Sequence, residues 1–300
     1  MTIVLDGGLA TTLQARGEDI SGALWSARLL LENPAAIEAA HAEFFRAGAT
    51  VCTTASYQAG SLSLERAGLD PGQAADLISL SVRLGRRARD EVCPDGLVAG
   101  SLGAYGASLA DGSEYTGDYR LPAGREVATL ADFHRPRVAA LAAAGADLIA
   151  VETIPTAVEA EAVARVLAEF ALPAWVSFTP AAGGTSTRDG VPLDEACRPL
   201  LEVPGMRAVG VNCCPPAQAS AALGCLAGLD RPASVGLIAY PNSGEQWDSP
   251  KARWVGEPGW DAGEVASWLT RVDLIGGCCR VGPAQIHELA RRVKVALGAE

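Results

Sequence analysis

Positive charge is scarce in this sequence. Its 24 Lys and Arg side chains are outnumbered by 35 Asp and Glu among 300 residues, so the formal net charge is −11 at pH 7. No block rich in lysine or arginine offers a local exception, because Arg83 to Arg89 has the pattern of a solvated helix face. This balance argues against nucleic acid and anionic membrane surfaces as partners.

Long apolar runs and a secretion signal are also missing. The longest apolar stretches are far shorter than the ~20 residues that span a membrane. Residues 1–5 lead directly into Asp6, without a charged n-region or an apolar h-region. Eight cysteines in such a chain suggest a reducing compartment, where thiols bind metal or lie buried. We therefore expect a cytoplasmic protein, and a monomer because no dimerisation arm is visible.

Short apolar segments alternate with helix-like stretches. The strand candidates are residues 3–5, 50–55, 97–102, 148–152, 174–178, 208–212, 234–239 and 274–275. Helical periodicity covers 34–47, 133–144, 157–170 and 261–270; Asn33 with Pro34 marks one helix start, and Ala-Gly-Ala turns at 47–49 and 144–146 mark helix ends. Eight such units predict an α/β fold, a (β/α)8 TIM barrel in one domain over residues 1–300. A doubly wound sheet is the competitor, but it would not naturally use eight equal units.

Polar side chains and thiols follow the strand candidates. In barrels of this kind the reactive residues lie at the carboxyl ends of the strands. The residues at these ends are Asp6, Ser56, Ser101, Glu152, Thr179, Cys213, Asn242 and Cys278. We therefore expect the functional site at this end of the barrel.

Two cysteine pairs carry the strongest chemical indication. Cys213-Cys214 and Cys278-Cys279 each follow a short β-rich run, and three thiolates make a soft site suited to Zn²⁺ with one position left open. Gly276-Gly277 lets the chain leave β geometry, so that both following thiols can reach one ion. Spacing leaves either Cys213 or Cys214 as the third ligand and favours Cys213, which is nearer the strand end. A vicinal disulfide is the alternative, which a reducing compartment disfavours.

The other cysteines and the histidines give weaker evidence for a metal site. No CxxC knuckle, which would indicate a structural zinc, is present. Four cysteines fit small buried hydrophobes: Cys52, Cys93, Cys197 and Cys225. The three histidines, His41, His134 and His287, fall in helical patterns and are interpreted as surface or helix residues, not as ligands.

The chain resembles the homocysteine S-methyltransferase family, most closely its single-domain members that use S-methylmethionine. The resemblance runs nearly end to end. Its segments, besides the two cysteine motifs, are Leu5-Asp6-Gly7-Gly8-Leu9-Ala10-Thr11, Leu24-Trp25-Ser26-Ala27, Thr54-Ala55-Ser56-Tyr57-Gln58-Ala59, Gly100-Ser101-Leu102-Gly103, Asp111-Gly112-Ser113-Glu114-Tyr115, Val151-Glu152-Thr153-Ile154-Pro155 and Tyr240-Pro241-Asn242-Ser243-Gly244-Glu245.

The resemblance implies a zinc-dependent transfer of a methyl group from a sulfonium donor to the thiol of homocysteine, which gives methionine. By position, the family's zinc ligands fall on Cys213, Cys278 and Cys279, and Cys214 stands where such proteins often have threonine. Glu152 resembles the carboxylate that holds the homocysteine ammonium. After Arg280, residues 281–282 depart from the hydroxyl-bearing residues usual there.

Further substrate contacts are expected around the same rim. Glycines in Asp6-Gly7-Gly8 let backbone N–H groups approach a substrate carboxylate closely. The donor cation calls for an aromatic face or an acid. The remaining candidates for contact with substrate are Ser56, Tyr57, Asn212 and Asn242, with Trp25, Tyr240 and Trp247 as further aromatic faces. Betaine-using relatives have an aromatic residue after the strand glutamate, where this chain has Thr153, so a sulfonium donor is favoured.

Other functions stay open. The same frame could use betaine or S-adenosylmethionine as donor, or a selenol such as selenohomocysteine as acceptor. A non-catalytic zinc or thiol sensor, closing a regulatory disulfide, is the alternative from another class. Such a sensor has no need of Glu152 or of the Asp6-Gly7-Gly8 turn, so the enzyme is the favoured hypothesis.

Overall fold

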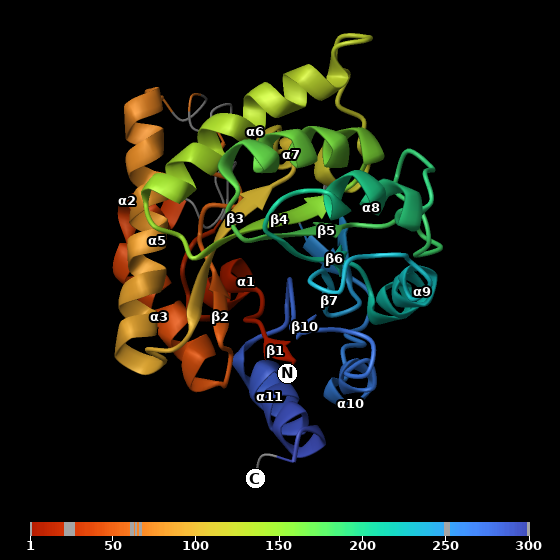
Figure 1. The fold of residues 1–300 in the computed structure, drawn as a ribbon. Coiled ribbons are helices and arrows are strands. Elements are labelled where there is room, and N and C mark those ends of the chain that lie inside the picture. The colour runs from red at the N-terminus through yellow and green to blue at the C-terminus, as the bar shows by residue number, and fades with distance from the viewer. Residues whose placement is uncertain are drawn as a thin grey trace.

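Eight parallel strands form the centre of the protein in the computed structural model, which describes residues 2–20, 28–60, 63, 65, 68–248 and 253–298 (Figure 1). Their order is β1-β10-β7-β6-β5-β4-β3-β2. The bounds are β1 Ile3–Val4, β2 Val51–Thr53, β3 Leu97–Gly103, β4 Leu148–Ile154, β5 Ala174–Phe178, β6 Met206–Asn212, β7 Gly236–Tyr240 and β10 Leu274–Ile275. A parallel bridge between Leu5 and Val51 joins the two edge strands. The predicted (β/α)8 barrel is confirmed.

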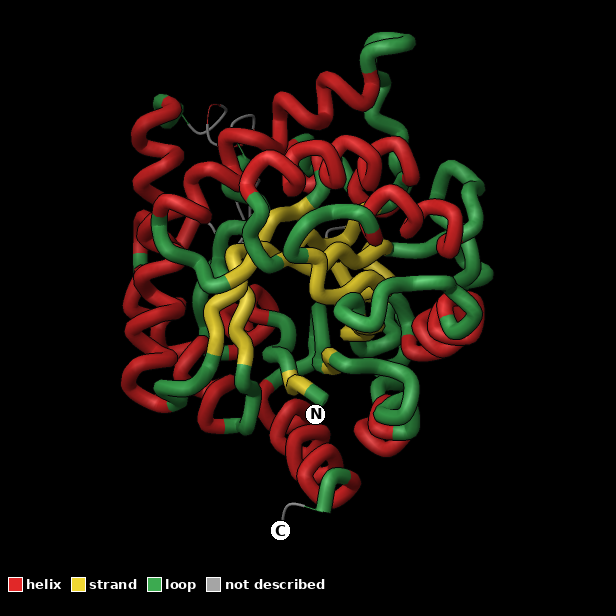
Figure 2. Tube along the Cα trace, in the orientation of Figure 1, coloured by secondary structure: helices red, strands yellow, loops and turns green. Residues whose placement is uncertain are grey.

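Helices surround this barrel and alternate with its strands (Figure 2). Their bounds are α1 Leu9–Ala15, α2 Leu29–Glu32, α3 Pro34–Arg46, α5 Pro71–Val92, α6 Glu126–Ala143, α7 Ala157–Phe170, α8 Leu193–Leu201, α9 Pro216–Leu226, α10 Ala262–Ala266 and α11 Pro283–Ala296. Two 3-10 segments, η2 Tyr105–Ser108 and η3 Ser113–Tyr115, follow β3, and an antiparallel pair, β8 Gln246–Asp248 and β9 Arg253–Val255, follows β7. None of the described helices is long and apolar enough to cross a membrane.

Local sequence explains most helix ends. Pro34 opens α3, as predicted, and the Asp70 side chain caps α5 by accepting from two backbone N–H groups. Gly48 and Gly145 have φ of 105° and 78°, the left-handed conformation that ends α3 and α6. The predicted helix at 261–270 is shorter in the structure, because after Ala266 the backbone bonds tighten to i→i−3 turns.

Small and large side chains fill the barrel interior together. Trp175 is fully buried there, and alanines on neighbouring strands leave the space for its ring. A second, larger apolar set packs between the strands and the helices. Gly210 on β6 is required by close strand approach, because a Cβ at that position would lie 1.9 Å from the carbonyl oxygen of Ile238. The core therefore holds the strand ends in fixed relative positions.

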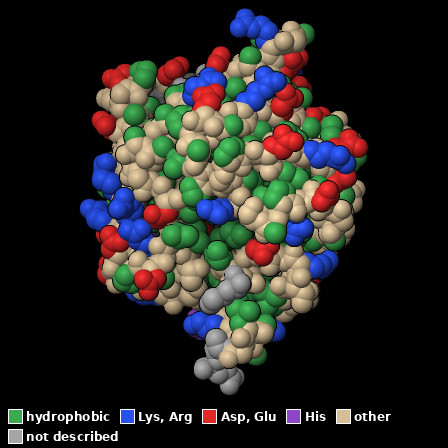
Figure 3. Space-filling model, in the orientation of Figure 1, with side chains coloured by type: hydrophobic (Ala, Val, Ile, Leu, Met, Phe, Trp, Pro, Cys, Tyr) green, Lys and Arg blue, Asp and Glu red, His purple; other side chains and the backbone are tan. Residues whose placement is uncertain are grey.

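The charged surface largely follows the sequence pattern. Figure 3 shows acidic and basic side chains interspersed over the face in view. Arg83, Arg86 and Arg87 on α5 are exposed, as predicted for a solvated helix face. Arg89 departs from that prediction: its side chain is 12% exposed and pairs with Asp147. The difference arises because the residue lies on the edge of α5 that faces the barrel.

Candidate metal and substrate site

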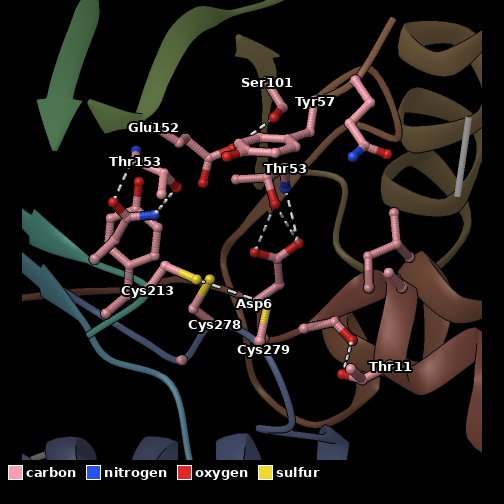
Figure 4. Close-up of a pocket in the computed structure, with 18 of the residues that line it drawn as sticks. Asp6, Thr11, Thr53, Tyr57, Ser101, Glu152, Thr153, Cys213, Cys278 and Cys279 are labelled. Carbon is pink, nitrogen blue, oxygen red and sulfur yellow. Dashed lines mark hydrogen bonds between the residues drawn. The ribbon is translucent and has the colours of Figure 1, made fainter. Parts of the chain in front are cut away.

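Three thiols meet at the carboxyl end of the barrel (Figure 4). Cys213 directly follows β6, and Cys278 and Cys279 lie in the loop after β10. Their Sγ atoms all lie within 4.8 Å of one another, and those of Cys213 and Cys279 are 3.7 Å apart. Hydrogen bonding with the Cys278 and Cys279 thiols holds the pKa of Cys213 well below its usual range. The same bonding, together with burial, raises the pKa of Cys278 and Cys279 well above theirs, so Cys213 is the thiol of this cluster that most readily carries negative charge.

The spacing of these sulfurs fits a tetrahedral metal. Zinc binds thiolate sulfur at about 2.3 Å, which places two sulfurs of a tetrahedron about 3.8 Å apart. The 3.7 Å between Cys213 and Cys279 matches that edge. In the described part of the chain, no fourth Cys, His, Asp or Glu ligand atom belongs to this cluster. Three soft ligands and one position left for a substrate are the donor set of a catalytic zinc.

Cys214 is not part of the three-thiol cluster, which agrees with the preference for Cys213 as the third ligand. It is buried and belongs to the apolar set outside the barrel. It also lines an adjoining pocket with Gln218 and Arg188. Burial raises the pKa of its thiol well above the usual range, which disfavours the thiolate that a metal needs. The structure places Cys213, and not Cys214, beside Cys278 and Cys279.

The loop after β7 holds both cysteine segments. The Asn242 side chain donates from Nδ2 to the carbonyl oxygen of Cys213 at 3.2 Å. Next to it, the Pro241 carbonyl oxygen accepts from the Cys278 backbone N–H at 2.8 Å. Cys213 itself has φ of 48°, a conformation that costs energy for a residue with a side chain. These bonds explain how that conformation is maintained.

An ion pair fixes the other side of the cysteine loop. The buried Glu245 carboxylate accepts from Arg280 Nε at 2.5 Å and from the Ser243 hydroxyl at 2.7 Å. The Ser243 backbone N–H in turn donates to the Cys279 carbonyl oxygen at 3.1 Å. Residues 240–245 thus form a bracket that is hydrogen-bonded to the backbone of all three cysteines of the cluster.

The two glycines before Cys278 are required because a side chain would not fit there, and not because the backbone adopts an unusual conformation. Neither has φ in the left-handed region. A Cβ on Gly276 would lie 2.7 Å from Leu5 Cβ, and one on Gly277 would lie 2.2 Å from a Val281 methyl carbon. The chain does leave β geometry before the thiols, as predicted, and glycine is needed because the β1 end and the following loop pack closely there.

Two buried carboxyl groups lie near the thiols on other strand ends. Asp6 accepts from the Thr53 backbone N–H at 2.8 Å and from its hydroxyl at 3.2 Å. Glu152, near the carboxyl end of β4, accepts from the Ser101 hydroxyl at 2.5 Å. Burial raises the pKa of Asp6 well above its usual range and raises that of Glu152 to about 7. A positively charged ligand would therefore stabilise the charged form of both carboxyl groups.

Asn212 supports the strand that carries Glu152. Its side-chain oxygen accepts from the Thr153 backbone N–H at 2.9 Å, and its Nδ2 donates to the Thr153 hydroxyl at 3.0 Å. Thr153 has φ of 64°, which is rare for a β-branched residue. The paired bonds from β6 stabilise this conformation and fix the direction of the neighbouring carboxylate.

The thiols and carboxyls share one cavity. Its lining contains Asp6, Gly7, Gly8, Leu9, Ala10, Thr11, Thr53, Thr54, Tyr57, Gln58, Ser101, Glu114, Tyr115, Glu152, Thr153, Asn212, Cys213, Tyr240, Gly277, Cys278 and Cys279. Three of these carry carboxyl groups, and none of these lining residues is Lys, Arg or His. A cavity with this lining favours a ligand with positive charge.

Comparison with known proteins places the chain in a family. A model of homocysteine S-methyltransferase matches residues 3–293. The homocysteine S-methyltransferase of Escherichia coli (strain K12) is 42% identical over 97% of this chain and 94% of its own length. Homocysteine S-methyltransferase YbgG of Bacillus subtilis (strain 168) is 40% identical over 96% and 93%. The chain belongs to the homocysteine S-methyltransferase family.

A solved structure agrees with this assignment. The crystal structure of the homocysteine methyltransferase MmuM from Escherichia coli, in its metallated form, matches with a TM-score of 0.83 and 40% identity. The match covers 97% of this chain and 96% of that one. The expected family and the expected class of enzyme, a methyltransferase, are confirmed.

Most of the predicted site residues of this methyltransferase line the cavity. They are Asp6, Gly7, Gly8, Tyr57, Glu152, Asn212, Cys213, Cys278 and Cys279. Ser56 and Asn242 do not: the Ser56 hydroxyl donates to the Ser101 carbonyl oxygen, and Asn242 lines the adjoining pocket. Of the further aromatic candidates, Tyr240 lines the cavity, whereas Trp25 and the side chain of Trp247 lie outside what the structure describes. Substrate contact by these residues stays a prediction.

Some lining residues had no role in the sequence-based prediction. Thr53 holds Asp6, and the Tyr115 hydroxyl lies 3.7 Å from Cys213 Sγ. Glu114 and Gln58 place polar groups in the same cavity. The segment 111–115 was visible as part of the family resemblance. It follows β3 as a 3-10 turn, without the periodicity that would have assigned its side chains to a strand end.

Proposed function

We propose that this protein transfers a methyl group from S-methylmethionine to the thiol of L-homocysteine and that it uses Zn²⁺. The observation that carries the proposal is the meeting of Cys213, Cys278 and Cys279 in a cavity whose lining bears three carboxyl groups and no basic side chain. The expected reaction brings together a thiol, which needs a soft metal, and a sulfonium, which carries a positive charge. The cavity offers three thiols to hold such a metal and three carboxyl groups to face the positive charge.

The metal would be held by the three thiolates. When bound there, Zn²⁺ would take the homocysteine sulfur as its remaining ligand and keep that sulfur as a thiolate at neutral pH. Tyr115 supports this arrangement, because its hydroxyl lies 3.7 Å from Cys213 Sγ and can donate to the ligand sulfur. The bracket of residues 240–245 keeps the ligands in place during turnover.

Glu152 is suited to the ammonium group of homocysteine. It is 7% exposed, lines the cavity and is directed by Ser101 and by the neighbouring Thr153–Asn212 pair. A bound ammonium would return the Glu152 carboxyl to its charged form, which burial alone disfavours. The substrate carboxylate would face the turn of Gly7 and Gly8 and the first amides of α1. The Gly8 N–H already donates to Val281, so the amides beside it are the available donors.

The chemistry is a displacement at the methyl carbon. The homocysteine thiolate supplies the electron pair of the new carbon–sulfur bond, and its proton has been released to solvent beforehand. The bond from the methyl carbon to the sulfonium sulfur breaks, and its electron pair stays on that sulfur. Acceptor and donor both become methionine, and positive charge disappears from the donor. No side chain has to act as a general base in this step.

A zinc or thiol sensor is disfavoured by the same cavity. Such a protein needs the thiols but not the buried carboxyls of Asp6 and Glu152 beside them. Betaine or S-adenosylmethionine as donor and selenohomocysteine as acceptor remain alternatives for the same site. The expectation of a monomer also stays a prediction.

The first test is methionine formation from homocysteine and S-methylmethionine. The protein is assayed for zinc as isolated, after chelation and after zinc is restored. We expect turnover that disappears with the metal and returns with it. Zinc-loaded protein without turnover would contradict the proposed pair of substrates. A reversible disulfide in metal-free protein as isolated would support the sensor.

A further inference from the structure

Two buried oxygen acceptors in the cavity lack a hydrogen-bond partner. They are Oε2 of Glu114 and Oε1 of Gln58, on side chains whose residues are 8% and 6% exposed. Both residues line the cavity that holds the three thiols. A buried acceptor without a donor costs free energy, so such a pair in a cavity indicates a ligand that brings N–H groups.

The other two cavity carboxyls are already engaged. Asp6 is bonded to Thr53, and Glu152 to Ser101. Glu114 differs because one of its carboxylate oxygens has no partner among the described residues. The cavity lining also offers it no Lys, Arg or His as a counter-charge. A positively charged ligand would therefore satisfy an oxygen of Glu114 that no described residue satisfies.

Glu114 and Glu152 enter the cavity from different elements. Glu114 stands next to Tyr115, whose hydroxyl contacts Cys213 Sγ, so this segment reaches the thiols from η3. Glu152 reaches the same cavity from the carboxyl half of β4 and is the group proposed for the homocysteine ammonium. Two amino acids need two ammonium sites, and these two carboxyls come from separate elements.

We propose that Glu114 binds the α-ammonium group of the methyl donor, with the side-chain oxygen of Gln58 as a second acceptor. The inference rests on the proposed function and adds to it the residues that select an amino-acid donor. A sulfonium has no N–H group, so unsatisfied acceptors match the ammonium end of the donor. Betaine, whose nitrogen carries no hydrogen, could not satisfy them.

The test measures donor and acceptor constants separately. In Glu114→Gln we expect the KM for S-methylmethionine, at saturating homocysteine, to rise about tenfold or more, because a charged hydrogen bond becomes a neutral one. The KM for homocysteine should stay within about twofold of the wild-type value. Asp111→Asn is the matched control: it removes an exposed charge from the same loop, and its side-chain oxygen can still accept from the Ser113 N–H.

Gln58→Met provides a second variant of similar size without the acceptor. We expect a smaller rise in the donor KM, with zinc content and helix content by circular dichroism as in wild type. An unchanged donor KM in both Glu114→Gln and Gln58→Met would overturn the proposal. A rise in the homocysteine KM alone in Glu114→Gln would also overturn it, since it would assign Glu114 to the acceptor.

Failure of the proposed function can be told apart from failure of this inference. If zinc-loaded wild-type protein does not turn over S-methylmethionine, the proposed reaction is wrong. Calorimetric titration of S-methylmethionine into the zinc-loaded protein without homocysteine then decides the role of Glu114 by itself. Binding that weakens about tenfold in Glu114→Gln supports the ammonium site. Equal binding in both proteins, or no binding in wild type, overturns it.

Discussion

Asn242 holds Cys213 and Cys214 through both its side chain and its backbone. Its Nδ2 donates to the Cys213 carbonyl oxygen at 3.2 Å, and its N–H donates to the Cys214 carbonyl oxygen at 3.0 Å. The Asn242 side-chain oxygen accepts from the Gly244 N–H at 2.8 Å, which fixes the amide orientation. Asn242, a predicted substrate contact, is thus connected through hydrogen bonds to a candidate metal ligand.

Removing this amide should weaken metal binding without unfolding the barrel. In Asn242→Ala we expect zinc affinity to fall about tenfold or more, the usual effect of losing a group that orients a metal ligand. Competition with a chromophoric chelator measures it. Gln218→Ala, in the same adjoining pocket, is the control and should bind zinc as wild type does. Wild-type zinc affinity with a raised donor KM would instead restore the original prediction for Asn242.

The three clustered thiols should be individually essential. Cys213→Ala, Cys278→Ala and Cys279→Ala are each expected to abolish zinc binding and turnover while circular dichroism shows a folded barrel. Cys214→Ala is the matched control, because this adjacent thiol faces the apolar set outside the barrel. It should retain zinc and most activity. Loss of zinc in Cys214→Ala with retention in Cys213→Ala would reverse the ligand assignment.

Glu152→Gln tests the acceptor site. We expect the homocysteine KM to rise about tenfold or more, because the amide cannot offer the charge that binds an ammonium. Zinc content and the donor KM should stay close to wild type. Steady-state kinetics with each substrate varied in turn gives both constants. Unchanged homocysteine kinetics would remove Glu152 from the site.

Much of this site follows from sequence because parallel strands bring their carboxyl ends together. Cys213, Cys278 and Glu152 are far apart in the chain, yet all follow short apolar runs, and the barrel topology alone implies that they meet. The choice of Cys213 over Cys214 is different, because spacing leaves either thiol as the third ligand and only favours Cys213; the resemblance to the family assigns it. Periodicity and the rule for barrels therefore locate the site but do not complete its ligand set.

Other features depend on contacts that periodicity does not report. Ser56 follows a strand candidate, but its hydroxyl is used by the Ser101 carbonyl oxygen and does not line the cavity. Glu114 enters the cavity from a 3-10 turn after β3, where no repeat of apolar residues predicts a direction. Arg89 has the same composition around it as its exposed neighbours, and only the packing of α5 places it against Asp147. Side-chain bonding between distant segments determines each of these cases.

His41 lies outside the site, and its burial predicts how the stability of the protein responds to acid. It is fully buried in α3 and neither ring nitrogen has a partner among the described residues. Burial lowers the pKa of its imidazole to about 4 from a usual 6.5. Because the folded-state pKa lies below the unfolded one, protons bind more readily to the unfolded chain. The free energy of unfolding therefore has its full value, as far as His41 is concerned, above pH 6.5. It decreases as the pH falls towards 4, by about 2 kcal/mol at pH 5.

His41→Leu should therefore flatten the acid dependence of stability. Between pH 7.5 and pH 5.0 we expect a smaller drop in the free energy of unfolding than in wild type, measured by urea denaturation of the zinc-free protein with its thiols reduced. The exposed His287→Gln on α11 is the control and should keep the wild-type dependence. Buried His134 contributes in the same direction in both variants, because its pKa is also lowered by burial. An equal drop in His41→Leu and wild type would show that His41 is protonated at the same pH in both states.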